Sequence, residues 1–296
     1  MSRLVLAAFL LAVPFVSAQP APPATYVALG SSFAAGPGIG TRAPGSPQRC
    51  SQSAINYAHL FAQARGLTLR DVTCSGATTA DVLEGNSFLP PQLDAVTPAA
   101  RLVTITIGGN DVSFIGNLYG WSCSNAPQRA TGPWHAVCQV EPSEEVEAAL
   151  AALGVHLRAI VQGIHQRAPA AHVIFVDYFT VVPASGSCPD RLPLTAAQLD
   201  AARSVAARLA AATESAARAN GADVLKASQL SAAHDVCSPD PWVTDFTFPS
   251  ASAQFQPIAY HPNAKAMQAV AAKLAEVVPE PIRSAPTSAD RSTTTH

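Results

Sequence analysis

Charged residues are scarce in this sequence. They make up 13% of the 296 residues, against about 25% in an average soluble protein. The formal net charge is −2, and no cluster of lysines and arginines stands out. We therefore expect no nucleic-acid partner. No two cysteines have C-x-x-C spacing, which argues against a zinc site or a thioredoxin-like redox site.

Long hydrophobic runs are also absent, except at the start of the chain. Arg3 precedes an apolar stretch, Leu4–Val16, which is too short to span a bilayer comfortably. Small residues follow at Ser17-Ala18, as at a signal peptidase site. We expect residues 1–18 to be a secretory signal peptide, with an uncleaved N-terminal anchor as the alternative. The mature protein is then secreted, has no stable membrane span, and is expected to be a monomer.

Secretion gives the cysteines a structural meaning. Their number is even, and six cysteines in an exported chain suggest three disulfides, although the sequence alone allows many pairings. We expect the pairing that follows sequence order, because each bridge then closes a loop between regular elements. The expected pairs are Cys50–Cys74, Cys123–Cys138 and Cys188–Cys237.

Apolar segments alternate with helical patterns along most of the chain. Strands of a parallel sheet read as continuous apolar runs because both faces are covered. The expected strands are Thr25–Leu29, Thr68–Thr73, Leu102–Ile107, Val173–Tyr178 and Ala222–Lys226, and the expected helices are Asn56–Arg65, Ser143–Arg167, Thr195–Asn220 and Asn263–Val277. This order predicts a three-layer α/β/α sandwich with a mostly parallel five-stranded sheet.

The domain organisation follows from the same alternation. We expect one domain over residues 25–278, followed by a disordered tail, residues 279–296, which is rich in proline, serine and threonine. Two long insertions, residues 112–142 and 231–260, contain several aromatic residues. Long loops in a compact domain are usually functional. Their aromatic side chains either line an apolar cleft or pack the loops onto the body of the domain.

Four short motifs carry the chemistry. Gly30-Ser31-Ser32 ends the first strand, and Cys74-Ser75-Gly76-Ala77-Thr78 follows the second. Gly108-Gly109-Asn110-Asp111 ends the third strand, and His261-Pro262-Asn263 opens the last helix. Open α/β folds build their sites at the carboxyl ends of the strands. Serine, backbone or amide donors and a late histidine are the groups that acyl transfer needs.

In this order and spacing, the four motifs resemble those of the SGNH (GDSL-type) hydrolases, in particular secreted lipases and esterases with three disulfides. The resemblance extends from Tyr26 to about Val277 and implies a flavodoxin-like sandwich. It implies Ser32 as the nucleophile, with Ser31 as the nearest rival, and His261 as the base. It also implies an oxyanion hole formed by the backbone N–H groups of Ser32 and Gly76 and the side chain of Asn110.

The sequence departs from the family pattern at two positions. Ser31 stands where the family often has aspartate before the nucleophile, and Ile258 stands where the family has aspartate three residues before the histidine. A catalytic base needs a group that fixes its tautomer. We expect a Ser–His dyad in which a backbone carbonyl at Ile258 orients His261. Asp245 or Asp240 folding back onto the histidine is the competing possibility.

The sequence therefore predicts a secreted serine ester hydrolase, a lipase, esterase or phospholipase that needs no metal or organic cofactor. Its substrate is expected to be a small-molecule or lipid ester. A carbohydrate acetylesterase is the nearest alternative activity, and an acyltransferase is a further one. From a different class comes a catalytically inactive SGNH domain that binds the cell envelope, which the departures at Ser31 and Ile258 would favour.

Overall fold

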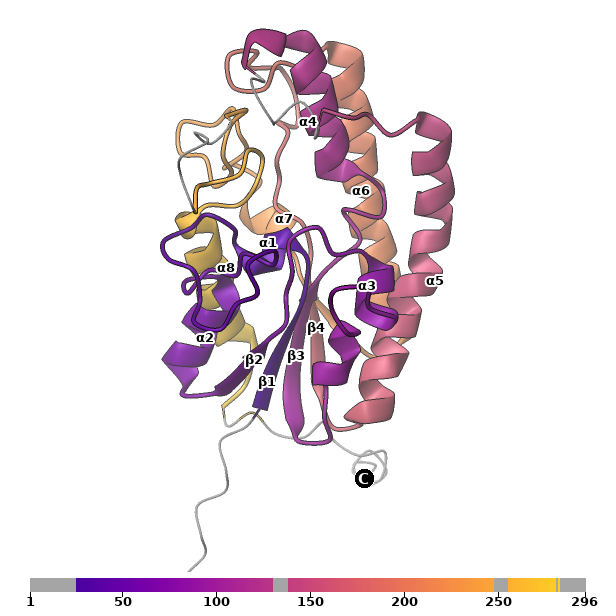
Figure 1. The fold of residues 1–296 in the computed structure, drawn as a ribbon, viewed down its shortest axis with the longest axis vertical. Helices are drawn as coiled ribbons and strands as arrows, with labels where there is room; N and C mark the ends of the chain where they lie inside the picture. Colours follow the sequence, from indigo (N-terminus) through magenta and orange to yellow (C-terminus); the bar gives the residue numbers. More distant parts are fainter. Residues whose placement is uncertain (1–24, 130–137, 248–254, 281, 283–296) are drawn as a thin grey trace, which may run out of the picture.

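Five strands form one parallel sheet at the centre of the molecule (Figure 1). The computed structural model describes residues 25–129, 138–247, 255–280 and 282. The strand order is β2-β1-β3-β4-β5, and all four strand pairings are parallel. The strands are β1 (Thr25–Gly30), β2 (Thr68–Asp71), β3 (Ala100–Thr106), β4 (His172–Val176) and β5 (Asp223–Leu225).

Helices cover both faces of the sheet. Helices α2 (Tyr57–Arg65) and α8 (Ala264–Val277) pack together on one face, while α5 (Ser143–Arg167) and α6 (Ala196–Ala219) cover the other (Figure 1). The shorter elements are α1 (Ser32–Ala35), α3 (Thr79–Leu83), η1 (Gln92–Ala95), α4 (Phe114–Asn125), η2 (Pro127–Arg129) and α7 (Ala227–Leu230). The predicted three-layer α/β/α fold is confirmed.

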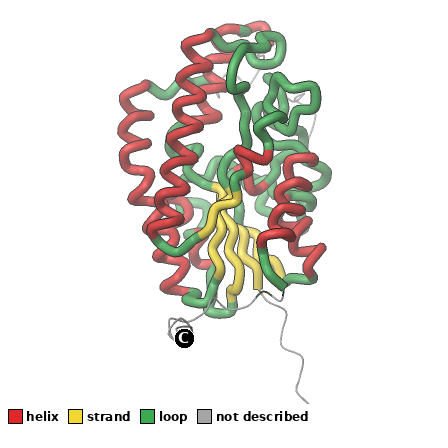
Figure 2. Tube along the Cα trace, turned by 180° about the vertical axis from the view of Figure 1, so that it is seen from behind, coloured by secondary structure: helices red, strands yellow, loops and turns green. Residues whose placement is uncertain are grey.

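The central strand β1 shows why the sheet forms where the apolar runs lie. Tyr26, Val27, Ala28 and Leu29 are fully buried, as expected of a strand covered on both faces. The Tyr26 hydroxyl bonds to Thr104 Oγ1 on β3 at 2.6 Å, so its polar atom is satisfied inside the core. The chain leaves β1 for β2 on one side and reaches β3 on the other. Open α/β sheets bind ligands at the carboxyl ends of the strands where the strand order reverses in this way, and Figure 2 shows loops gathered above this end of the sheet.

Side-chain caps fix the starts of two long helices. Thr195 caps α6 in a capping box with Gln198, which satisfies N–H groups at the helix start. Asn263 caps α8, and its side-chain oxygen accepts from the N–H groups of Lys265 and Ala266. Because His261 lies two residues before this cap, the start of α8 also fixes the place where the histidine leaves the loop.

The insertion at residues 112–142 contains a helix that local sequence preference does not favour. We expected a loop, yet α4 runs from Phe114 to Asn125, although glycine is a poor helix former. Tertiary packing decides the outcome. Phe114 and Leu118 are buried, and Gly120 lies so close to Gln139 that an added Cβ would be 2.3 Å from its carbonyl oxygen.

Three disulfides join the cysteine pairs that sequence order suggested. They are Cys50–Cys74, Cys123–Cys138 and Cys188–Cys237. Cys74 lies just after β2 and Cys123 lies in α4. The disulfides therefore hold the loops at the carboxyl end of the sheet rather than the sheet itself.

Two residues after position 278, the predicted end of the domain, contact the rest of the molecule. The Glu280 carboxylate pairs with Arg65 on α2, and Ile282 packs against the core. The predicted signal peptide, residues 1–18, and the remainder of the predicted tail, residues 283–296, lie outside the described residues.

Within the described ranges, α5 alone is long and apolar enough to cross a membrane by length and composition. The buried helix of a globular core meets the same criteria. α5 packs along α6 and also contacts α3. Its buried residues include Leu153, Leu157, Ile160 and Ile164. The helix therefore forms part of the domain core.

Candidate active site

Ser32 lies at the sharp turn that follows β1. Gly30 has φ +130°, and an added Cβ would lie 2.4 Å from the carbonyl oxygen of Thr106 on the neighbouring strand. Only glycine fits this turn without strain. The Ser31 N–H then donates to Thr106 O at 2.8 Å, and Ser32 begins the short helix α1. The strand thus ends by presenting two serines at the carboxyl edge of the sheet.

His261 contacts the second of these serines. Its Nε2 lies 2.8 Å from Ser32 Oγ, although 229 residues separate the two positions in sequence. The other ring nitrogen, Nδ1, lies 2.8 Å from the carbonyl oxygen of Ala259. A carbonyl oxygen can only accept a hydrogen bond, so Nδ1 carries the proton and Nε2 presents its lone pair to the serine hydroxyl.

The carbonyl that orients His261 belongs to Ala259 and not to Ile258, which corrects the sequence-based prediction. The Ile258 carbonyl already accepts bonds from the Thr244 hydroxyl at 2.5 Å and from the His261 N–H at 3.2 Å. The Ile258 carbonyl is thus bonded to these two groups, and the Ala259 carbonyl accepts from the ring. The Asp240 carboxylate pairs with Lys265 instead.

The loop that carries His261 is tied to the segment before it. Tyr260 N–H donates to Thr244 O, and Thr244 N–H donates to His261 O, both at 3.0 Å. Tyr260 adopts φ +61°, a conformation that is uncommon outside glycine. Its ring is fully buried, and its hydroxyl bonds to Ser122 on α4 at 2.5 Å. These contacts hold a strained backbone position immediately before the histidine.

Burial sets the protonation state of His261. The residue is 6% exposed, and its ring lies 5.2 Å from the ring of Phe33. Burial lowers the pKa of His261 to about 4, and the bond to Ala259 O opposes this shift only in part. Desolvation disfavours the charged imidazolium. The ring is therefore neutral at pH 7, the form in which it can take a proton.

The low pKa of His261 predicts a pH dependence for the ester hydrolysis that the sequence leads us to expect. Because the neutral ring persists down to about pH 4, kcat/KM is expected to stay level from pH 7 to about pH 5. A histidine with an ordinary pKa of about 6.5 would already be mostly protonated at pH 5. The measurement is kcat/KM for a p-nitrophenyl ester against pH, and an acid limb centred near pH 6.5 would contradict it.

The same shift has a consequence for folding stability. An unfolded histidine takes up its proton near pH 6.5, whereas the folded His261 does so at about 4. Between these values the unfolded state binds more protons, so His261 reduces the free energy of unfolding as the pH falls from about 6.5 to about 4. Below this window both states are protonated and the contribution is constant.

Gly76 and Asn110 lie at the carboxyl ends of the strands on either side of β1. Cys74 N–H donates to Gly30 O at 2.9 Å, which ties the segment after β2 to the end of β1. Gly76 follows with φ +83°, and its N–H has no acceptor among the described residues. The Asn110 amide nitrogen donates to Ala77 O at 2.8 Å. Since an amide carries two N–H bonds, one remains for another acceptor.

A second set of contacts fixes these two loops to each other. The Asp111 carboxylate accepts from the Thr79 N–H at 3.0 Å, and from the Thr79 hydroxyl. His156 on α5 bonds to the same hydroxyl at 3.2 Å. The loop after β3 is thus tied to the start of α3. The donors on Gly76 and Asn110 therefore come from two loops that are held together.

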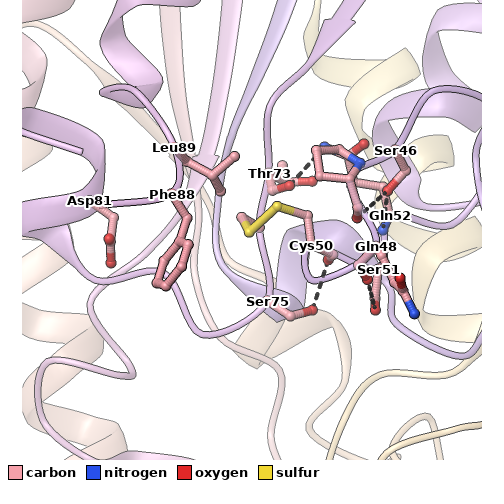
Figure 3. Close-up of a disulfide and its surroundings, with 12 residues drawn as sticks. Ser46, Gln48, Cys50, Ser51, Gln52, Thr73, Ser75, Asp81, Phe88 and Leu89 are labelled. Atoms are coloured by element: carbon pink, nitrogen blue, oxygen red, sulfur yellow. Dashed lines mark hydrogen bonds between the residues drawn. A yellow bond between two sulfur atoms is a disulfide. The ribbon is translucent and has the colours of Figure 1, made fainter. Parts of the chain in front are cut away.

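A cavity of about 190 Å³ is lined by Gly76 and by residues of the segment from Pro47 to Gln52. Cys50, Cys74 and Leu89 line this cavity, and Figure 3 shows the disulfide with Leu89 near it. Ser75 Oγ donates to Cys50 O at 3.0 Å. Phe88 is 75% exposed, and the guanidinium carbon of Arg49 lies 4.7 Å from the centre of its ring. The disulfide and Ser75 thus anchor the loop that carries Gly76.

Sequence reasoning brought Ser32, His261, Gly76 and Asn110 to one end of the sheet, and missed their supports. Besides Ala259, the site includes Tyr178, whose hydroxyl lies 3.1 Å from Ser31 Oγ. Tyr178 follows β4 at the same edge of the sheet, which was the signal available for finding it. Over the described parts of the chain, no group of three histidine, cysteine or acidic side chains is placed to hold a metal ion.

A buried serine bonded to a neutral histidine at the carboxyl edge of a parallel sheet is the arrangement of a hydrolase with a serine nucleophile. Residues 28–269 match the model of the GDSL-like lipase/acylhydrolase family. The chain belongs to this family, and the resemblance noted in the sequence is confirmed. The protein is accordingly an ester hydrolase.

Relatives agree with this assignment. Lipase 2 of Streptomyces coelicolor is 34% identical over 228 residues, which are 74% of this chain and 75% of the relative. An extracellular lipase of Streptomyces rimosus has a similar structure, with TM-score 0.66, 27% identity and coverage of 85% and 98% of the two chains. Phospholipase A1 of Streptomyces albidoflavus NA297 gives TM-score 0.67, 25% identity and coverage of 86% and 99%.

Proposed function

We propose that Ser32 and His261 form the catalytic dyad of a secreted esterase or lipase that acts through an acyl-enzyme. The observation that carries the proposal is the 2.8 Å contact between Ser32 Oγ and His261 Nε2, with Nδ1 bonded to Ala259 O. The contact supplies the general base that a serine hydroxyl needs. The carbonyl of Ala259 takes the place that a carboxylate has in a triad.

The first half of the reaction forms the acyl-enzyme. Ser32 Oγ attacks the carbonyl carbon of the ester while its proton moves to His261 Nε2. The carbonyl oxygen becomes an anion, which the N–H groups of Ser32 and Gly76 and the amide of Asn110 stabilise. The bond to the alcohol then breaks, and Nε2 returns the proton to the leaving oxygen. The acyl group stays on Ser32.

The second half repeats the same steps with water. A water molecule gives a proton to Nε2 and attacks the acyl carbon, and the oxyanion forms again in the same place. The bond to Ser32 Oγ breaks, the serine regains its proton from Nε2, and the carboxylic acid product leaves. No step requires a metal or an organic cofactor.

Labelling with a fluorophosphonate probe tests the assignment of the nucleophile. The wild-type protein is expected to form a covalent adduct because the probe reacts with an activated serine hydroxyl. The Ser32→Ala variant is expected to form none, while Ser31→Ala still does. Tryptic mass spectrometry locates the adduct. Absence of labelling in the folded wild-type protein would support an inactive binding domain and overturn the proposal.

We propose lipids or other esters with an apolar group as substrates, and secretion by cleavage of residues 1–18. Two similar solved structures support this proposal: one is an extracellular lipase and the other is a phospholipase A1. Assays of the wild-type protein with p-nitrophenyl esters of increasing acyl length report the preferred substrate. Equal rates for acetyl and longer chains would weigh against a lipid substrate, and the mass of the exported protein reports the cleavage site.

A further inference from the structure

Tyr178 connects the two turns that carry Ser32 and Asn110. Its hydroxyl accepts from the Gly109 N–H at 2.8 Å and bonds to Ser31 Oγ at 3.1 Å. Ser31 is 1% exposed and Tyr178 is 8% exposed, so little water competes for these bonds. Ser31 directly precedes the proposed nucleophile, Ser32, and Gly109 directly precedes the proposed oxyanion donor, Asn110.

The ring of Tyr178 is fixed by its surroundings. It packs against Phe33 with ring centres 4.7 Å apart, and against Phe114 at 6.2 Å. A Cβ added to Gly109 would lie 2.5 Å from the Tyr178 ring, so the turn after β3 leaves room for this ring by having glycine there. The hydroxyl is therefore held at a defined point between the two turns.

Among the described residues, the Ser31 N–H to Thr106 O bond is the last backbone bond between the end of β1 and the end of β3. Past this point, β1 continues into α1 and β3 continues into Gly108-Gly109-Asn110. The Tyr178 hydroxyl supplies the next connection. Burial raises the pKa of Tyr178 well above its ordinary value, so the phenol keeps its proton and remains able to donate to Ser31 Oγ.

We propose that Tyr178 is a positioning residue for the oxyanion hole, whose hydroxyl sets the separation between the turn that carries Ser32 and the turn that carries Asn110. The inference rests on the proposed function of that site. Hydrogen-bond donors stabilise an oxyanion only when they are aimed at the position where it forms. Tyr178 acts on the reaction through Gly109 and Ser31, and it does not touch the reacting atoms.

Replacing Tyr178 by phenylalanine keeps the ring and removes the hydroxyl. We expect kcat to fall by about 10- to 100-fold, the size of effect that a misplacement of about 1 Å produces, with KM changed by less than about twofold. Affinity for an alkyl trifluoromethyl ketone, whose adduct carries the oxyanion, is expected to weaken by the same factor as kcat/KM. If Tyr178 had only a structural role, the ratio of the affinity for the ketone to the affinity for the substrate would stay the same.

Tyr26→Phe is the matched control, because it removes another buried hydroxyl, bonded to Thr104 at 2.6 Å in the middle of the sheet. It is expected to lower stability while leaving kcat within about twofold of wild type, as expected when no catalytic group moves. Equal kcat in Tyr178→Phe and Tyr26→Phe would overturn the inference.

Ser31→Ala provides a second variant that does not disturb the ring. Its kcat is expected to fall by a smaller factor, and the double variant with Tyr178→Phe is expected to be no slower than Tyr178→Phe alone, because both act through one hydroxyl. Effects that multiply would overturn the inference. If wild type itself neither hydrolyses esters nor takes the fluorophosphonate label, the proposed function fails, a result distinct from normal hydrolysis by Tyr178→Phe.

Discussion

Ser32→Ala and His261→Ala are each expected to hydrolyse p-nitrophenyl esters with a kcat on the order of 10⁶-fold below that of wild type, the loss seen when a nucleophilic serine or its histidine base is removed from another enzyme. The double variant is expected to be no slower than either single variant. The reason is that the hydroxyl and the imidazole act as one unit, joined by a 2.8 Å contact. Initial rates at saturating substrate, corrected for spontaneous hydrolysis, measure the effect.

The control for this experiment is another histidine of the same region. His234 stacks on Trp242, with ring centres 4.1 Å apart, and its Nδ1 lies 2.7 Å from Asp240 O. It resembles His261 in bonding to a carbonyl, but it does not contact Ser32. His234→Ala is expected to keep kcat within about threefold, since it removes no group that reacts. A loss of less than tenfold in folded His261→Ala would mean that another group is the base.

The Ala259 carbonyl explains how His261 works without a carboxylate partner. A carbonyl oxygen fixes the tautomer as well as a carboxylate does, because it accepts a hydrogen bond from the Nδ1–H group. It carries no negative charge, however, so it stabilises the imidazolium less. Burial lowers the pKa of His261 to about 4, and the bond to this carbonyl raises it only in part. The expected result is a base that stays active in mild acid.

The sheet was predictable from local signals, and the candidate site residues came from the resemblance of four short motifs to those of the SGNH hydrolases. Apolar runs such as Tyr26–Leu29 identify strands covered on both faces. Parallel strands end at one edge, so motifs that follow neighbouring strands converge there. Ser32, Gly76 and Asn110 follow β1, β2 and β3, which are adjacent in the sheet.

The supports of the site were not predictable because they depend on tertiary geometry. Ser31 and Tyr178 are 147 residues apart, and nothing in either local sequence pairs them. The choice between the Ile258 and Ala259 carbonyls depends on how Thr244 closes the turn. Helix α4 likewise follows from packing against the body, against the preference of its glycines. In each case a partner distant in sequence decided the outcome.

Replacing Asn110 by alanine is expected to lower kcat by about 10²- to 10³-fold, which corresponds to roughly 3–4 kcal/mol of lost oxyanion stabilisation. KM is expected to change little, because the amide acts on charge that appears only in the transition state. Asn110→Asp is expected to be slower still, since a carboxylate at this position repels the developing anion. Steady-state kinetics with one short-chain ester measures all three proteins.

Loss of the Asn110 amide has a second effect, on the loop that carries Gly76, which must be separated from the loss of an oxyanion donor. Asn110 donates to Ala77 O at 2.8 Å, so its removal also loosens the loop that carries Gly76. Asn125→Ala removes a comparable amide, which donates to Pro193 O at 2.8 Å and to Gln198 on α6 at 2.7 Å, and it calibrates the loss of stability alone. If Asn110→Ala loses stability like Asn125→Ala but keeps kcat within about threefold, Asn110 is a loop anchor and not an oxyanion donor. If kcat falls as expected while the urea midpoint of unfolding stays close to that of Asn125→Ala, the amide acts on the oxyanion itself.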